Sequence, residues 1–221
     1  MERNKIDKSK MKKVILNSPN QIEEALKFTG NIKVKGDFKN IIVCGVGGSA
    51  LPANILLTYL NLLSSDYPPI YIHRDYGLPR WGGKKSLIIC VSYSGNTEET
   101  ISAFKTALKR NLKIVGIASD GKIAELCKKN KIPLITVPSG IQPRSATGYI
   151  FTSLLKLLSN SKIVRDGLKE IKKTVKELKK IKAEKEGQKI AKRLVGKIPI
   201  IYASNQFKSL ALAWKIKFNE N

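Results

Sequence analysis

The sequence predicts an α/β protein with a parallel sheet and helices on both faces. Short apolar runs, typical of buried strands, alternate with longer stretches whose apolar residues recur at helical spacing. The connections between them are short and rich in small or polar residues, which is the pattern of repeated strand–helix units. The 221 residues, 42% of them apolar, suffice for the core of one large domain or two small ones.

The first 160 residues contain five expected strands and five expected helices. The strands are short runs rich in Ile, Val and Leu, at residues 40–44, 70–74, 87–91, 113–118 and 134–137. The helices have an amphipathic pattern or follow a strand after a short loop, at residues 21–28, 51–63, 98–110, 122–130 and 147–158. Residues 1–20 show neither pattern, and we expect a poorly ordered start or a short docking segment.

A lysine-rich helix is expected next, over residues 161–197. Its apolar residues recur at helical spacing, at Val164, Leu168, Ile171, Val175, Leu178 and Ile181. The formal net charge of +24 would suit a nucleic-acid-binding protein, which stays an alternative. However, no aromatic residue in the segment could stack on bases. We therefore interpret it as a solvated helix face and expect no specific nucleic-acid partner.

The last residues repeat the order of strand, small turn and helix, with a strand expected over 198–203 and a helix over 207–217. This unit looks like the start of a second, similar domain, and it cannot bury both of its faces alone. It must pack on the first domain or a partner, or the chain is a fragment, which we favour. The predicted parts are an N-terminal segment (1–20), the first domain (21–160), a basic linker helix (161–197) and an incomplete second domain (198–221).

Several classes of protein are not expected. No apolar run approaches the roughly 18–20 residues of a membrane span, and the polar N-terminus lacks a signal-peptide segment. We expect a cytoplasmic protein without a membrane partner. Cys44, Cys90 and Cys127 have no paired spacing and are interpreted as reduced thiols. His73 is the one histidine and Cys-x-x-Cys is absent, so no metal site is expected.

The loop after the expected strand 87–91 predicts an anion site. It contains Ser92, Ser94, Thr97 and one glycine, and it leads into a helix from about Glu98. Backbone N–H groups at a helix N-terminus favour a phosphate. The loop has no lysine or arginine, so dipoles and hydroxyls would bind the anion. The alternative is that Ser92 only caps the end of a strand.

A second candidate loop follows the first expected strand. Residues 45–50 (Gly-Val-Gly-Gly-Ser-Ala) loosely match the dinucleotide-binding fingerprint, and Asp75 lies near the position where that fingerprint has an acid. Ser49, however, adds a hydroxyl at the helix entry. Two hydroxyl-bearing loops suit a sugar phosphate better than a pyrophosphate. Dinucleotide binding, and glycines that only permit a tight turn, stay as alternatives.

The two loops together resemble those of a sugar isomerase (SIS) domain, through 47–49 (Gly-Gly-Ser) and 92–97 (Ser-Tyr-Ser-Gly-Asn-Thr). Three further pieces resemble the bifunctional phosphoglucose/phosphomannose isomerases: 74–79 (Arg-Asp-Tyr-Gly-Leu-Pro), 142–145 (Gln-Pro-Arg-Ser) and 218–221 (Phe-Asn-Glu-Asn). The resemblance covers nearly the whole chain. It implies a flavodoxin-like three-layer sandwich and a protein with two SIS domains that is longer than this chain.

The resemblance implies phosphate binding by Ser92, Ser94 and Thr97, with Gly48 and Ser49 lining the same pocket. These are the substrate-binding residues that we expect.

The resemblance also implies two catalytic residues. Arg144 would stabilise negative charge near the reacting carbons, and Glu220 would move a proton between C1 and C2. Aldose–ketose isomerisation needs such a base and a cation or donors facing the enediolate oxygens. The resemblance implies no redox cofactor and no metal. As alternatives, Arg144 is an ordinary surface residue and Glu220, next to last in the chain, is frayed.

The expected function is interconversion of glucose 6-phosphate, and also mannose 6-phosphate, with fructose 6-phosphate through a cis-enediolate, in a homodimer when full length. In the family, a histidine beyond the Asn-Glu-Asn motif assists ring opening from the neighbouring subunit. This chain ends before that point, so we expect that it can be an inactive fragment. The alternative is a non-catalytic SIS module that binds a phosphosugar.

Overall fold

The computed structural model describes residues 7–63, 66–181 and 183–220. A five-stranded, all-parallel sheet forms its centre, with the strands in the order β2-β1-β3-β4-β5. The strands are β1 (Asn40–Cys44), β2 (Ile70–His73), β3 (Ser86–Val91), β4 (Lys113–Ala118) and β5 (Leu134–Thr136). Each lies within one residue of its predicted bounds, which confirms the predicted α/β class.

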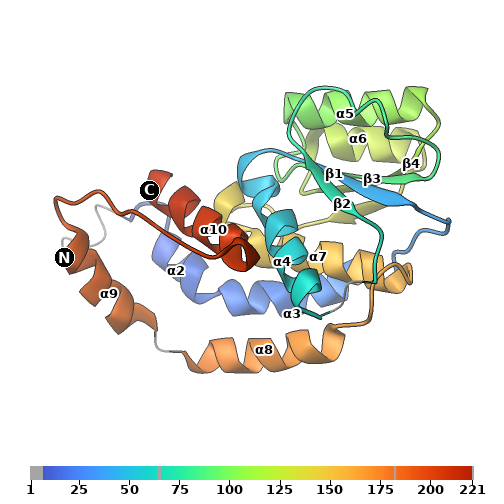
Figure 1. The fold of residues 1–221 in the computed structure, drawn as a ribbon. Helices are drawn as coiled ribbons and strands as arrows, with labels where there is room; N and C mark the ends of the chain where they lie inside the picture. The colour runs from blue at the N-terminus through green and yellow to red at the C-terminus, as the bar shows by residue number, and fades with distance from the viewer. Residues whose placement is uncertain (1–6, 64–65, 182, 221) are drawn as a thin grey trace.

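Helices cover both faces of the sheet (Figure 1). One face carries α5 (Glu98–Lys109) and α6 (Gly121–Lys129), and the other carries α3 (Ser18–Thr29), α4 (Leu51–Leu63) and α7 (Thr147–Asn160). Successive residues of β1 alternate between the two cores: Ile41 and Val43 pack with α4 and α7, whereas Ile42 and Cys44 pack with α5 and α6. Both faces of the sheet are therefore buried under helices, as the uninterrupted apolar strands predict.

The start of the chain docks on this sandwich. Residues 7–20 contain α2 (Met11–Leu16), which contacts α3, and α3 itself begins three residues before the predicted helix at 21–28. This confirms the docking alternative for the described part of segment 1–20. Residues 1–6 lie outside the described residues. The three cysteines are buried free thiols.

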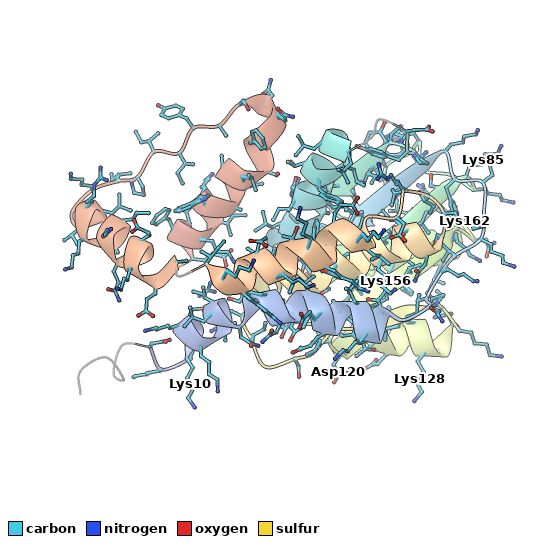
Figure 2. All side chains as sticks on the ribbon, turned by 90° about the horizontal axis from the view of Figure 1, so that it is seen from below. Lys10, Lys85, Asp120, Lys128, Lys156 and Lys162 are labelled. Atoms are coloured by element: carbon cyan, nitrogen blue, oxygen red, sulfur yellow. The ribbon has the colours of Figure 1, made fainter. Side chains whose placement is uncertain are left out.

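The prediction of one long basic helix over 161–197 was wrong. The structure has two helices, α8 (Leu168–Lys180) and α9 (Ala183–Leu194), and Ile181 between them adopts an extended backbone with φ −70° and ψ 117°. The apolar stripe of α8 docks on α3 and buries Ile171 and Val175, whereas α9 buries no side chain. Figure 2 shows lysine side chains projecting outward around the molecule rather than gathering in one stripe.

The strand expected over 198–203 was also wrong. The segment has no regular structure, and Ile198 and Tyr202 are 91% and 88% exposed. A strand needs a neighbour for its backbone N–H and C=O groups, and Figure 1 places this segment beside α9 and α10, away from the sheet. The short helix η3 (Asn205–Phe207) and α10 (Lys208–Asn219) follow. The division into two domains stays a prediction.

The last helix packs on the first sandwich. α10 contacts α4, and the hydroxyls of Thr58 and Ser209 hydrogen-bond across this contact. Ser209 is the buried residue of α10. None of the helices in residues 7–63, 66–181 and 183–220 is long and apolar enough to cross a membrane.

Gly116 on β4 is expected to be essential for packing of α6 on the sheet. A Cβ there would lie 2.5 Å from Cys127 Sγ and 3.1 Å from Cδ1 of Leu134. Gly116→Ala should therefore lower the free energy of unfolding by about 1–3 kcal/mol. The matched control is Gly187→Ala in α9, where a Cβ meets open space. Urea unfolding followed by circular dichroism should give a lower midpoint for the first variant only; equal midpoints would contradict the packing argument.

Candidate functional site

The candidate site lies at the carboxyl ends of β1 and β3. The strand order reverses between these two strands, and such a switch point is where open α/β sheets bind ligands. Residues Asn40–Cys44 of β1 pair one for one with Ser86–Cys90 of β3, so the two strands end at the same level. The loops 45–50 and 92–97 therefore leave the same edge of the sheet, as predicted.

The loop 92–97, here called the hydroxyl loop, is ordered by its own side chains. Ser92 is fully buried, and its Oγ lies 2.9 Å from Thr97 Oγ1 and accepts the Thr97 N–H at 3.4 Å. Ser94 is exposed and Thr97 is half-buried. Thr97 occupies the position before α5, but its side chain caps no backbone N–H of that helix. The first N–H groups of α5 thus point to a place where an anion can bind.

Contacts with the first residues of α6 also hold the hydroxyl loop in place. Gly95 has φ +74°, and a Cβ there would lie 1.7 Å from the backbone oxygen of Asp120. The Gly95 oxygen accepts the Ile123 N–H at 2.9 Å, and Asn96 Oδ1 accepts the Lys122 N–H at 3.0 Å. The glycine is required because two backbone segments touch at this point. The shape of the loop is therefore set before any ligand binds.

The turn after β1 lies between the hydroxyl loop and Arg144. Gly48 and Ser49 are in the short helix η1 (Gly47–Ser49). A Cβ on Gly48 would lie 2.8 Å from the Arg144 nitrogen, so only glycine permits this approach. Ser49 is buried, and its Oγ accepts the Tyr93 N–H at 3.1 Å. In this structure both residues support neighbouring groups: Gly48 supports the Arg144 turn and Ser49 supports the hydroxyl loop.

Arg144 and Glu220 come together although 76 positions separate them. Arg144 is in the short helix η2 (Pro143–Ser145), and Glu220 follows α10 directly. Arg144 Nη1 lies 3.7 Å from Glu220 Oε2, with side-chain exposures of 20% and 39%. Lys217 Nζ donates to the Arg144 carbonyl oxygen. Burial lowers the pKa of Lys217, and the Glu220 carboxylate acts in the opposite direction.

A cavity of about 570 Å³ opens beside this charged group. Arg144 and Lys217 line it, together with apolar side chains such as Leu51, Ile55 and Trp214. The structure therefore groups the predicted residues in two clusters, the hydroxyls of 92–97 and the Arg144–Glu220 pair. The turn at Gly48 and Ser49 touches both clusters.

Two buried polar residues of this region are absent from the prediction. Gln21 on α3 donates from Nε2 to the Ser145 oxygen at 2.8 Å and accepts the Gly148 N–H at 3.1 Å. Tyr93, between the two serines of the hydroxyl loop, is buried and hydrogen-bonded through its phenol. Tyr93 could have been noticed as a large residue inside a loop of small ones. No local signal in the sequence marks Gln21.

No three His, Cys, Asp or Glu side chains gather in the described part of the chain in a way that could hold a metal ion. His73, at the end of β2, shares a hydrogen bond of 3.1 Å between its Nε2 and the Gly77 oxygen.

The sequence is similar to proteins of known class. It is 37% identical over 220 residues to the bifunctional phosphoglucose/phosphomannose isomerase of Caldicellulosiruptor bescii, covering 94% of this chain and 64% of that protein. The chain is a homologue of the bifunctional phosphoglucose/phosphomannose isomerases. A D-glucosamine-6-phosphate 4-epimerase of Sulfolobus acidocaldarius is 34% identical over 189 residues, covering 83% of this chain and 57% of that protein. The chain thus spans less than two thirds of either relative.

Two further matches concern the family and the fold. Residues 183–221 match the family described as the bacterial phospho-glucose isomerase C-terminal SIS domain. The C-terminal domain of glucosamine-fructose-6-phosphate aminotransferase from Francisella tularensis has a similar fold, with a TM-score of 0.64 and 19% identity. That match covers 95% of this chain and 66% of the aminotransferase domain. The predicted SIS-type α/β fold is confirmed, and the homology to these isomerases agrees with the motifs from Gly47 to Asn221.

Ser49 and Ser94 are expected to differ in their effect on stability. Ser49→Ala leaves the buried Tyr93 N–H without its acceptor, so the free energy of unfolding should fall by about 1–3 kcal/mol. Ser94→Ala removes an exposed hydroxyl and should change the free energy of unfolding by no more than about 0.5 kcal/mol. Guanidinium unfolding of both variants checks this. Equal destabilisation would show that Ser49 has no supporting role.

Proposed function

We propose that the chain binds a sugar phosphate at the hydroxyl loop and belongs to an isomerase that interconverts glucose 6-phosphate and mannose 6-phosphate with fructose 6-phosphate. The observation that supports it most is the approach of Arg144 to Glu220 at 3.7 Å, across a turn shared with the hydroxyl loop. A cation and a base beside a phosphate site are the parts that isomerisation needs. The homology to the isomerases supports the same reaction.

The phosphate would be bound without a cationic side chain from the loop. Ser94 and Thr97 would donate their hydroxyls, and the first N–H groups of α5 would add the favourable end of the helix dipole. Ser92 is fully buried, so its role in this proposal is to orient Thr97 through their 2.9 Å contact. Ser49 and Gly48 would shape the same pocket from the side of β1.

The proton transfer would use Glu220 and Arg144. In the open-chain aldose, the Glu220 carboxylate would take the proton from C2, the C–H electron pair would form the C1–C2 double bond, and the C1=O1 π pair would move onto O1 to give the enediolate. The O2 hydroxyl proton would pass to O1, and the same carboxyl group would return its proton to C1 while O2 becomes the ketose carbonyl oxygen. Arg144 would stabilise the oxygen charge that develops between these steps. For this, Glu220 has to exchange its contact with Arg144 for one with the substrate.

The remaining organisation is proposed on the same basis. Residues 161–197 would link the first domain to a second SIS domain that begins in 198–221. The family match over 183–221 supports the presence of a second SIS domain and starts within this linker, at the beginning of α9. The working form would be a cytoplasmic homodimer, as the resemblance implies.

Thr97→Val tests the phosphate site. The variant keeps the shape of the side chain and removes one hydroxyl donor, so the dissociation constant for fructose 6-phosphate should rise about tenfold or more. Isothermal titration calorimetry measures it. Thr106→Val is the matched control, since Thr106 Oγ1 donates within α5 to the Ser102 oxygen. An unchanged affinity in Thr97→Val, or an equal loss in the control, would argue against the hydroxyl loop as the phosphate site.

Glu220→Gln tests the chemistry. It should lower the rate of fructose 6-phosphate formation from glucose 6-phosphate by about 10²–10⁴-fold and leave substrate affinity nearly unchanged, because a general base is lost without a change of shape. Glu177→Gln is the control, since Glu177 is ion-paired with Lys180 on α8. Retained turnover would remove Glu220 as the base. Both variants are made in the full-length protein, and binding without any turnover by that unaltered protein would favour the non-catalytic phosphosugar-binding module instead.

A further inference from the structure

Tyr93 is hydrogen-bonded to the loops that follow three other strands. Its backbone N–H donates to Ser49 Oγ in the loop after β1, at 3.1 Å. Its backbone oxygen accepts the N–H and the hydroxyl of Ser119, directly after β4, at 2.9 and 2.6 Å. Its phenol reaches the loop after β5. One residue of the hydroxyl loop thus joins the strand-end loops of β1, β4 and β5.

The phenol makes two hydrogen bonds of opposite sense. Its O–H donates to the Pro138 oxygen at 2.9 Å, and its oxygen accepts the Ile141 N–H at 3.2 Å. Tyr93 is only 6% exposed. Burial raises the pKa of this phenol, so it keeps the proton that it donates. Both backbone partners lie in the stretch that leads from β5 into the turn of Arg144.

The stretch from 138 to 141 determines where the Arg144 turn begins. The η2 turn starts at Pro143, and the Ser145 N–H closes it on the Gln142 oxygen at 2.8 Å. Because the Pro138 oxygen and the Ile141 N–H both bond to the Tyr93 phenol, the residues that lead into this turn are held in place relative to the hydroxyl loop. Gly48 packs against the backbone of Arg144 within the turn, and Gln21 donates to the Ser145 oxygen at its end.

We propose that Tyr93 is a positioning residue that couples the hydroxyl loop to the Arg144 turn, so that a sugar phosphate bound at the loop meets Arg144 at a fixed place. This role in substrate binding rests on the proposed function. The hydrogen bonds of Tyr93 that carry the coupling are present without any ligand. Tyr93 touches no reacting atom in this scheme. It acts through the backbone at Pro138 and Ile141.

The test compares Tyr93→Phe with Tyr149→Phe in the 221-residue chain. Each variant removes one buried phenol oxygen from the same core, but the Tyr149 phenol donates to Glu24 on α3 at 2.6 Å and does not bond the loops. Two probes are titrated by NMR, fructose 6-phosphate and inorganic phosphate. Both would use the hydroxyl loop, and only the sugar phosphate would extend to Arg144. Hydrogen exchange of the Ile141 and Ile123 amides is followed without ligand.

In Tyr93→Phe, the dissociation constant for fructose 6-phosphate should rise about tenfold, since the Pro138 oxygen and the Ile141 N–H lose their partner and the Arg144 turn shifts. The constant for inorganic phosphate should stay unchanged. Exchange of the Ile141 amide should speed up about tenfold, while Ile123, which is bound to Gly95, keeps its rate. Tyr149→Phe should leave both constants and the Ile141 rate unchanged.

Equal weakening of both probes in Tyr93→Phe would show a general structural role and overturn the proposal. Unchanged affinity for the sugar phosphate would overturn it as well. Failure of the unaltered chain to bind either probe would count against the proposed function. In that case the Ile141 exchange rate alone decides the coupling, and an unchanged rate in Tyr93→Phe would disprove it.

Discussion

The parallel pairing of β1 with β3 is the constraint on which the site depends. Because their residues pair one for one from Asn40 to Cys44, both strands end at one level and release two loops side by side. The strand order reverses here, so α4 and α5 leave toward opposite faces of the sheet. A shift of one residue in this register would turn each β1 side chain to the other core and separate the two loops.

The Arg144–Glu220 pair depends on a second, longer-range interaction. α10 reaches Arg144 because it packs on α4, where the Thr58 and Ser209 hydroxyls meet. Its end then places Lys217 on the Arg144 carbonyl and Glu220 beside the guanidinium. Partial burial of Arg144 and Glu220 keeps their mutual attraction stronger than it would be in bulk water. The hydroxyl loop and the Arg144–Glu220 pair thus come from distant parts of one chain.

The sequence allowed accurate prediction of what is decided locally. Strands and helices between residues 21 and 160 followed from apolar periodicity, whereas α2 was not predicted. The hydroxyl loop followed from residue types placed between a strand and a helix. The errors concern structure that needs a distant partner. Residues 198–203 have the composition of a strand but no neighbouring strand, and the basic region forms two helices because only α8 packs on α3. The bonds of Gln21 span more than 120 positions, so no local pattern could reveal them.

The excess of lysine complements a phosphate site that is built from dipoles, because such a site attracts an anion only at short range. Hydroxyls and N–H groups attract an anion only over the length of a hydrogen bond, and the hydroxyl loop has no cation of its own. Lys85, Lys128 and Lys162 point outward at the same end of the molecule (Figure 2), where β3 begins and α6 and α7 end, so they lie at the opposite edge of the sheet from the hydroxyl loop. A net charge of +24 nevertheless produces a positive potential around the whole chain, which concentrates anions near it until salt screens the field. Long-range attraction is therefore general, and in the proposed function the short-range geometry of Ser94, Thr97 and the α5 N-terminus selects the sugar phosphate.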